Sequence, residues 1–226
     1  MVAFNNYSSF DLVKKMQKAL GDAIDSQGGK KADLMEFFKF YHCSNINQCA
    51  EGFCYLRESG RIDASKMLVR PVIESMFKLV AVHKNSAIFF RIAYSEYIEE
   101  KKWFNNPSNP MSKTNLDLLT QQWEEFKKLF QKQFPSHSIN ETECSTYQAA
   151  EVAESIDFYN SHYRMYCKFT HGAFRAISGG MRSFDDFDNT TMISCILGAL
   201  EYLISAEASI PNFDEIKQEA LNLCTN

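Results

Sequence analysis

Glycine and proline are scarce in this sequence, with 9 Gly and 5 Pro among 226 residues. These two residue types mark most tight turns, so their scarcity argues against a β-fold built from many short strands. Hydrophobic residues make up 45% of the chain, close to the average of globular proteins, which excludes wholesale disorder. At this length the chain suits one large domain.

Long runs of uncharged apolar residues are also missing. A membrane-spanning helix needs about 18 to 20 such residues, and the nearest approach, 192–204, is interrupted by Glu201. The N-terminus has neither the basic start nor the apolar stretch of a signal peptide. We therefore expect a soluble, cytoplasmic protein that does not associate with membranes. The net charge of −4 provides no global attraction for nucleic acid, which leaves only a local basic patch for such binding.

Signatures of metal sites and of common enzymes are absent as well, because there is no Cys-x-x-Cys, no His-Glu-x-x-His and no glycine-rich phosphate loop. The seven cysteines are odd in number, and several fall in apolar helical patterns, which indicates buried free thiols in a reducing compartment. His42, Cys43, Cys49 and Cys54 are not spaced like a compact zinc site, so core packing is their expected role. The acidic stretch 184–188 could hold a divalent cation, but such residues more often start a helix. We expect no metal and no cofactor.

Apolar residues recur every three to four positions along most of the chain, as they do in amphipathic helices. This pattern predicts an all-α fold, a helical bundle of about seven to nine helices. The expected helices cover residues 9–26, 32–58, 63–83, 87–104, 116–134, 146–156, 192–208 and 213–223, with a further stretch that starts near 157. Asn45 and Asn47 could bend the second helix, and Pro71 either kinks the third or lies in the first turn of a later start. The expected organisation is a single domain, 1–226, with an N-terminal helix in 1–30, the bundle core in 31–210 and a C-terminal helix in 211–226.

One stretch, 157–172, concentrates polar side chains that can bind and react. Its candidate site residues are Asn160, His162, Tyr163, Arg164 and His171. Arg164 and His171 are seven residues apart, which on an unbroken helix places them on the same side and about 10 Å from each other. That separation is wide for one phosphate. A shared site therefore needs a helix break near Gly172 or a second protomer that completes it.

The Arg164-x6-His171 spacing resembles the Arg-x(4–6)-His motif of HEPN proteins, small helical bundles of which many are metal-independent ribonucleases of toxins and anti-phage systems. In those proteins a polar residue commonly follows the arginine, where this chain has Met165. A broader likeness, over about residues 30–205, is to an uncharacterised helical family that often appears related to HEPN proteins, domain of unknown function 5677. The residues that carry this second resemblance are Arg70-Pro-Val-Ile-Glu74, Tyr94-x-x-Tyr97, and Tyr163 leading to His171-Gly172.

The resemblance implies a HEPN-like endoribonuclease of a defence or stress system, dimeric, with two motifs in one cleft. Cleavage of RNA by its own 2′-hydroxyl needs a group that transfers protons and a cation that stabilises the phosphorane. His171 would transfer protons, since the ordinary pKa of histidine is about 6.5, and Arg164 would hold phosphate oxygens. Asn160, His162 and Tyr163 would contact the substrate, the latter two by stacking on a base or else as ordinary interface aromatics.

The alternative is a non-enzymatic helical module that binds a partner protein or a nucleotide. Arg164 would then form a structural ion pair with Glu74, and His171 would cap a helix end. Arg70 and Glu74 lie four residues apart on one helix face, either as an exposed ion pair or with Glu74 partly buried and facing a basic partner from another helix. The expected partners are therefore RNA, a second copy of the chain and, on the alternative, a partner protein.

Overall fold

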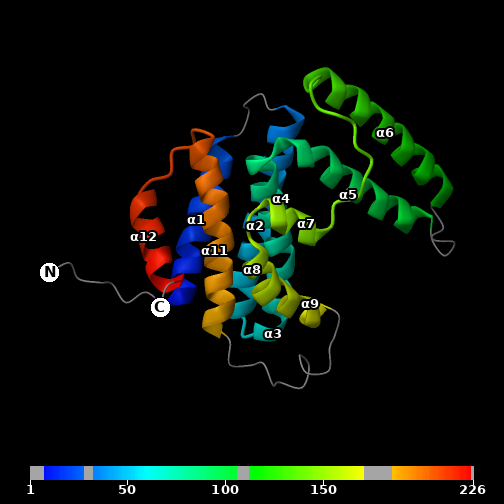
Figure 1. The fold of residues 1–226 in the computed structure, drawn as a ribbon. Coiled ribbons are helices and arrows are strands. Elements are labelled where there is room, and N and C mark those ends of the chain that lie inside the picture. Colours follow the sequence, from blue (N-terminus) through cyan, green and yellow to red (C-terminus); the bar gives the residue numbers. More distant parts are fainter. Residues whose placement is uncertain (1–7, 28–32, 106–111, 171–184, 225–226) are drawn as a thin grey trace.

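The computed structural model describes residues 8–27, 33–105, 112–170 and 185–224, and all regular secondary structure in these ranges is helical (Figure 1). The all-α fold that the apolar periodicity predicts is thereby confirmed. Among these helices, none combines the length and the apolar character that a membrane span requires. The elements are α1 (Ser9–Ser26), α2 (Leu34–Glu58), α3 (Ile62–Lys66), α4 (Val69–Lys84), η1 (Ser86–Ile88), α5 (Phe89–Phe104), α6 (Ser112–Gln133), α7 (Thr146–Val152), α8 (Ile156–Phe158), η2 (Tyr159–Tyr163), α9 (Arg164–Thr170), α11 (Asp185–Ser205) and α12 (Phe213–Cys224).

The hydrophobic core forms where α1, α2, α4 and α11 pack against one another (Figure 1). Each contributes a stripe of fully buried side chains, because its apolar residues recur at helical spacing. Burial of one such side chain stabilises the fold by roughly 1.5–3 kcal/mol. Helix α12 covers α1 and α11, while α3, α7 and the α8–α9 segment lie against α2 and α4. Representative buried core residues are Met16, Leu20, Ile46, Phe53, Ile73, Phe77, Ile193, Ile196 and Leu200.

Helix α2 runs without interruption through Asn45 and Asn47, so the expected bend there is wrong. The amide of Asn45 donates a hydrogen bond of 2.7 Å to Ser75 on α4, and Gln17 on α1 donates one of 3.2 Å to Asn47. Because these amides are engaged by neighbouring helices, they do not compete for the backbone of α2. Gly60 ends the segment with a φ of 71°, in the left-handed region that glycine adopts without steric cost.

The long helix predicted for 63–83 is two elements, α3 and α4. Helix α4 begins at Val69 and places Pro71 in its first turn. The missing N–H of proline removes no intrahelical hydrogen bond at that place, since the first amides of a helix have no partner within it. The second of the two alternatives for Pro71 is therefore the one that the structure adopts.

Two helices start earlier than the apolar pattern indicates. Helix α6 begins at Ser112 rather than near residue 116, and α11 begins at Asp185 rather than at 192. In α11 the early start follows from a long-range contact, because Asp188 lies buried in its first turn and faces basic side chains of α2 and α3. Helices α5 and α6 form a hairpin on the side of the bundle away from α12 (Figure 1).

Candidate functional site

The segment that carries the candidate site residues Asn160, His162, Tyr163 and Arg164 is a continuous helical stretch, α8–η2–α9, from Ile156 to Thr170 (Figure 1). Its middle, Tyr159–Tyr163, is a π-helical turn, which accommodates one extra residue compared with an α-helical turn. Single π-turns inside α-helices occur frequently at functional sites. The spacing of apolar residues does not predict this turn, because a π-turn and an α-helical turn are both helical and differ by one residue.

The inner side of this segment is attached to the bundle by aromatic side chains. Tyr163 and Tyr166 are buried, and the ring of Phe77 on α4 lies 6.2 Å from the ring of Tyr163. Phe158 and Tyr159 lie at the same centroid distance from Phe77. These contacts fix the outer side of the segment toward solvent.

Tyr163 also makes a polar contact with α4. Its hydroxyl donates a hydrogen bond of 2.7 Å to Glu74 Oε1, and Arg70 Nε lies 2.9 Å from the same oxygen. The guanidinium of Arg70 lies over the Tyr163 ring at 5.6 Å. Burial raises the pKa of Tyr163, and the negative charge of Glu74 raises it further, so the phenol stays protonated and acts as a donor. Arg70 and Glu74 therefore form an ion pair that is partly shielded from solvent and that holds Tyr163 in place.

Arg164 lies on the opposite, solvent-exposed side. The alternative that paired it with Glu74 inside the bundle differs from the structure, because Glu74 faces Arg70 and Tyr163 and Arg164 is exposed. Arg164 makes no ion pair with any residue that the structure describes. Its head group is available to a ligand.

Asn160, Arg164 and Lys168 recur at intervals of four residues and are all exposed. Together they form what we call the Arg164 face. They line one shallow hollow, with Tyr159, Ser161, Tyr163, Met165 and Cys167. The hollow brings together three of the candidate residues, Asn160, Tyr163 and Arg164, and adds a second cation, Lys168. The spacing from Arg164 could have identified Lys168 in the sequence.

His162 does not line this hollow, and of its two expected roles, stacking on a base or packing as an interface aromatic, the structure favours packing. Its ring is stacked between Phe158 and Phe187, at centroid distances of 4.2 and 4.3 Å and interplanar angles of 8° and 9°. Both faces of the ring are therefore covered, and a nucleotide base has no face left to stack on. Burial lowers the pKa of His162. The ring joins α8 to the first turn of α11.

His171 lies outside the described residues, as does Gly172. The described part of α9 ends at Thr170. The expected distance between Arg164 and His171, and the expected helix break at Gly172, therefore stay predictions.

A buried polar cluster supports the candidate segment from beneath, and the sequence interpretation missed it. Asp188 accepts a hydrogen bond of 2.5 Å from the Tyr166 hydroxyl and one of 2.6 Å from Arg57 Nη2. Lys66 Nζ lies 3.9 Å from the same carboxylate. Burial and the charge of Asp188 raise the pKa of Tyr166. Asp188 thus faces cationic side chains of the protein itself, and not the divalent cation that the acidic stretch 184–188 could hold.

The His42 and cysteine cluster packs in the core. His42 is 2% exposed, and burial lowers its pKa to about 3, so the ring is neutral. Burial raises the pKa of Cys43 to about 12 and that of Cys54 to about 11, which keeps both thiols protonated. All seven cysteines of the chain are free thiols. Within the described ranges, no three His, Cys, Asp or Glu side chains converge in a way that could hold a metal ion.

Comparison with known proteins places the chain in a family. A family model, described as a family of unknown function (DUF5677), matches residues 36–189, which is more than half of the chain. The match runs from the first turn of α2 to the start of α11, so it contains the Arg70–Glu74 pair, the Arg164 face and Asp188. No curated protein and no solved structure matches. The chain belongs to the family of unknown function DUF5677, as its Arg70–Glu74, Tyr94–Tyr97 and Tyr163–Gly172 motifs predicted.

Proposed function

We propose that this protein is a HEPN-like, metal-independent endoribonuclease that holds the RNA backbone with its Arg164 face and transfers protons with His171. The observation that carries the proposal is the exposure of Arg164 without an ion pair. Three other arginines of the described structure are engaged, Arg57 with Asp188, Arg70 with Glu74, and Arg91 with the carbonyl oxygen of Glu143, whereas Arg61 is exposed like Arg164. An unpaired arginine whose helix is fixed by buried aromatics is well suited to bind an anion.

The composition of the Arg164 face favours a phosphodiester. A guanidinium offers a planar pair of N–H donors that matches two phosphate oxygens, and Lys168 adds a second positive charge one helical turn away. Asn160, one turn before Arg164, can both donate and accept hydrogen bonds, as recognition of a ribose 2′-hydroxyl requires. The face is a local basic patch on a chain whose net charge is −4. It supplies the electrostatic attraction that the chain as a whole lacks.

The proposed reaction is attack of a ribose 2′-hydroxyl on the adjacent phosphorus. The new O–P bond forms as the bond to the 5′-oxygen of the next nucleotide breaks, and the products are a 2′,3′-cyclic phosphate and a 5′-hydroxyl. His171 accepts the proton of the 2′-hydroxyl or donates one to the departing oxygen, and Arg164 stabilises the charge of the phosphorane. A homodimer would supply a second Arg164–His171 pair to the same cleft.

The test compares RNA binding with RNA cleavage in matched variants. We expect His171→Ala to abolish cleavage and to keep binding, and Arg164→Ala to weaken both. Lys18→Ala is the control, because Lys18 is exposed on α1 and its substitution also removes one positive charge. It should leave both properties unchanged. Equal cleavage by His171→Ala and the wild-type protein, or cleavage by neither, would remove the catalytic claim.

The non-enzymatic alternative depended on Arg164 as a structural ion pair. Because the Arg164 side chain is exposed, the structure disfavours a non-enzymatic protein in which Arg164 forms a structural ion pair. RNA binding at the Arg164 face without cleavage by the wild-type protein would replace the nuclease proposal with an RNA-binding module.

A further inference from the structure

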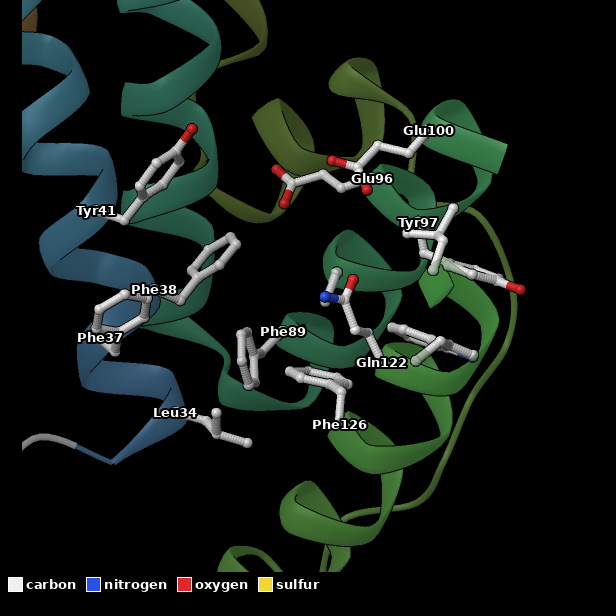
Figure 2. A pocket seen from close by; sticks show the side chains of 13 residues that line it. Leu34, Phe37, Phe38, Tyr41, Phe89, Glu96, Tyr97, Glu100, Gln122 and Phe126 are labelled. Atoms are coloured by element: carbon white, nitrogen blue, oxygen red, sulfur yellow. The ribbon is translucent and has the colours of Figure 1, made fainter. Parts of the chain in front are cut away.

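A second surface of the protein has the features of a protein-binding groove. It lies between the α5–α6 hairpin and α2 (Figure 2). Its volume is about 400 Å³, and it shares no lining residue with the hollow of the Arg164 face. Leu34, Phe37, Phe38 and Tyr41 of α2 stand on one side, and Gln122 and Phe126 of α6 on the other, as Figure 2 shows. Phe89 of α5 lies between them. We call this surface the α5–α6 groove.

Aromatic rings form a connected floor. The ring of Phe89 lies 5.1 Å from that of Phe38 and 6.1 Å from that of Phe126, so it joins α2 to α6. Farther along, Trp123 stacks on Phe126 at 5.2 Å and on Tyr97 at 4.7 Å. Such a packed floor is rigid, and it can bind a partner without first having to become ordered.

The rim of the groove exposes large apolar side chains to water. Phe37 is 64% exposed and Tyr41 is 55% exposed, one helical turn apart on α2. Full burial of one aromatic side chain stabilises an assembly by roughly 1.5–3 kcal/mol. Contiguous exposed apolar surface of this kind marks interaction sites on soluble proteins. A partner that covers both rings would gain that stabilisation.

The groove extends along the whole of α5. A second hollow shares Glu100, Leu119 and Gln122 with the first and continues to Trp103 and Phe104. From Phe89 to Phe104 the rise of an α-helix gives a length of about 22 Å. An elongated channel of that length matches an α-helix of about four turns, whereas a small molecule would fill only part of it.

The charge of the lining has one sign. Among the described residues, the charged side chains of the lining are Glu96, Glu99 and Glu100, and none of the described lysines, arginines or histidines lines either hollow. Glu96 lies 2.6 Å from Lys78 and Glu99 lies 2.8 Å from Lys102. Glu100 makes no ion pair with any described residue. An occupant with positive charge near Glu100 would complement it.

We propose that the α5–α6 groove binds an amphipathic, cationic α-helix of a partner protein. The apolar side chains of that helix, spaced i, i+4 and i+7, would lie on the aromatic floor, and a lysine or arginine of the helix would face Glu100. Charge favours such a partner over a second copy of this chain, whose net charge is −4. The inference is independent of the proposed ribonuclease activity.

The test uses a fluorescein-labelled amphipathic peptide of about five turns, with a leucine stripe flanked by lysines. Two control peptides have the same composition in scrambled order, and the same stripe with glutamate in place of lysine. We expect the amphipathic peptide to bind at least about tenfold more tightly than either control in fluorescence anisotropy. Equal binding of all three peptides, or none, would overturn the proposal.

Variants then locate the binding surface. Phe37→Ser and Tyr41→Ser should each weaken the peptide by about tenfold, and Glu100→Gln should weaken it by about threefold and reduce its salt dependence. Tyr55→Ser is the matched control, since Tyr55 is 70% exposed on α2 and lies outside the groove. It should bind like the wild-type protein. Unchanged peptide affinity in the groove variants would overturn the proposal. A dimer in solution that Phe37→Ser dissociates would also overturn it, because the groove would then hold a second copy of the chain.

Discussion

The guanidinium of Arg57 lies 2.6 Å from the carboxylate of Asp188, although the two residues are 131 positions apart. Their side chains are only 8% and 1% exposed. The pair connects α2 to the first turn of α11, and Tyr166 adds α9 through its own hydrogen bond to Asp188. With Lys66 of α3, side chains of four helices thus meet at one carboxylate beneath the segment that presents Arg164.

Removal of this carboxylate should destabilise the protein strongly. Asp188→Ala removes the buried carboxylate that accepts a hydrogen bond from Arg57 and lies 3.9 Å from Lys66, and we expect a loss of about 3–5 kcal/mol in the free energy of unfolding. Urea denaturation measures it. Asp22→Ala, which removes an exposed carboxylate on α1, should change the stability by less than about 0.5 kcal/mol. A loss below about 1 kcal/mol for Asp188→Ala would show that the cluster does not hold the helices together.

Local features of the fold could be predicted from the sequence, whereas features set by distant contacts could not. Ser8 caps α1 by accepting a hydrogen bond from the Asp11 amide, as a serine before an apolar helical pattern predicts. The uninterrupted course of α2 at Asn45 depends on Ser75 of another helix. The early start of α11 depends in the same way on Arg57 and Tyr166, which belong to other helices and contact Asp188. Local spacing in the sequence does not predict these contacts.

The candidate site shows the same division. The four-residue spacing of Asn160, Arg164 and Lys168 is visible in the sequence, and the structure places all three on one exposed face. The stacking of His162 between two phenylalanines is not visible, because Phe187 belongs to a different helix. The residue type of His162 alone does not indicate that both faces of its ring are covered.

Stability should fall as the solution becomes acidic because of His42. Burial lowers its pKa in the folded protein to about 3, from an ordinary value of 6.5. Below pH 6.5 the unfolded chain binds a proton at this position that the folded protein does not, so stability is full above pH 6.5 and decreases as the pH falls. The expected loss from this residue between pH 7 and pH 5 is about 2 kcal/mol.

The measurement is urea denaturation of the wild-type protein and His42→Phe at both pH values. The aromatic replacement keeps ring contacts with Phe38 and Tyr41 and cannot be protonated. We expect the variant to lose about 2 kcal/mol less than the wild-type protein on acidification. Between pH 7 and pH 8 the two proteins should behave alike, since histidine is neutral in the folded and unfolded chains. Identical losses at pH 5 would mean that His42 becomes protonated in the folded state.

The cysteines should differ in reactivity according to burial. Cys224 is exposed, whereas Cys43 and Cys195 are fully buried with pKa values that burial raises. An aromatic disulfide reagent should therefore modify Cys224 first, and modification of Cys43 and Cys195 should require unfolding. Mass spectrometry of labelled peptides distinguishes the sites. Rapid labelling of Cys195 in the folded protein would contradict the packing of α11 in the core.

Arg164 and His162 should have opposite effects on RNA binding and on stability. Arg164→Ala should weaken RNA binding by about tenfold and reduce the salt dependence by about one phosphate contact, with little change in stability. His162→Ala removes a ring that is stacked between Phe158 and Phe187, so we expect it to lower stability by about 1–3 kcal/mol and to leave RNA affinity within about twofold. Fluorescence anisotropy and thermal unfolding give the two values. Weaker RNA binding by a folded His162→Ala protein would place the binding surface elsewhere.

The most direct test of the proposed reaction is to identify the ends of the RNA products. Purified protein is incubated with single-stranded RNA in excess EDTA, and the fragments are analysed by mass spectrometry. We expect the wild-type protein to yield 2′,3′-cyclic phosphate and 5′-hydroxyl ends and His171→Ala to yield neither, while Lys18→Ala cleaves like the wild-type protein. Intact RNA after incubation with the wild-type protein, or the same fragments with His171→Ala, would contradict the proposed reaction.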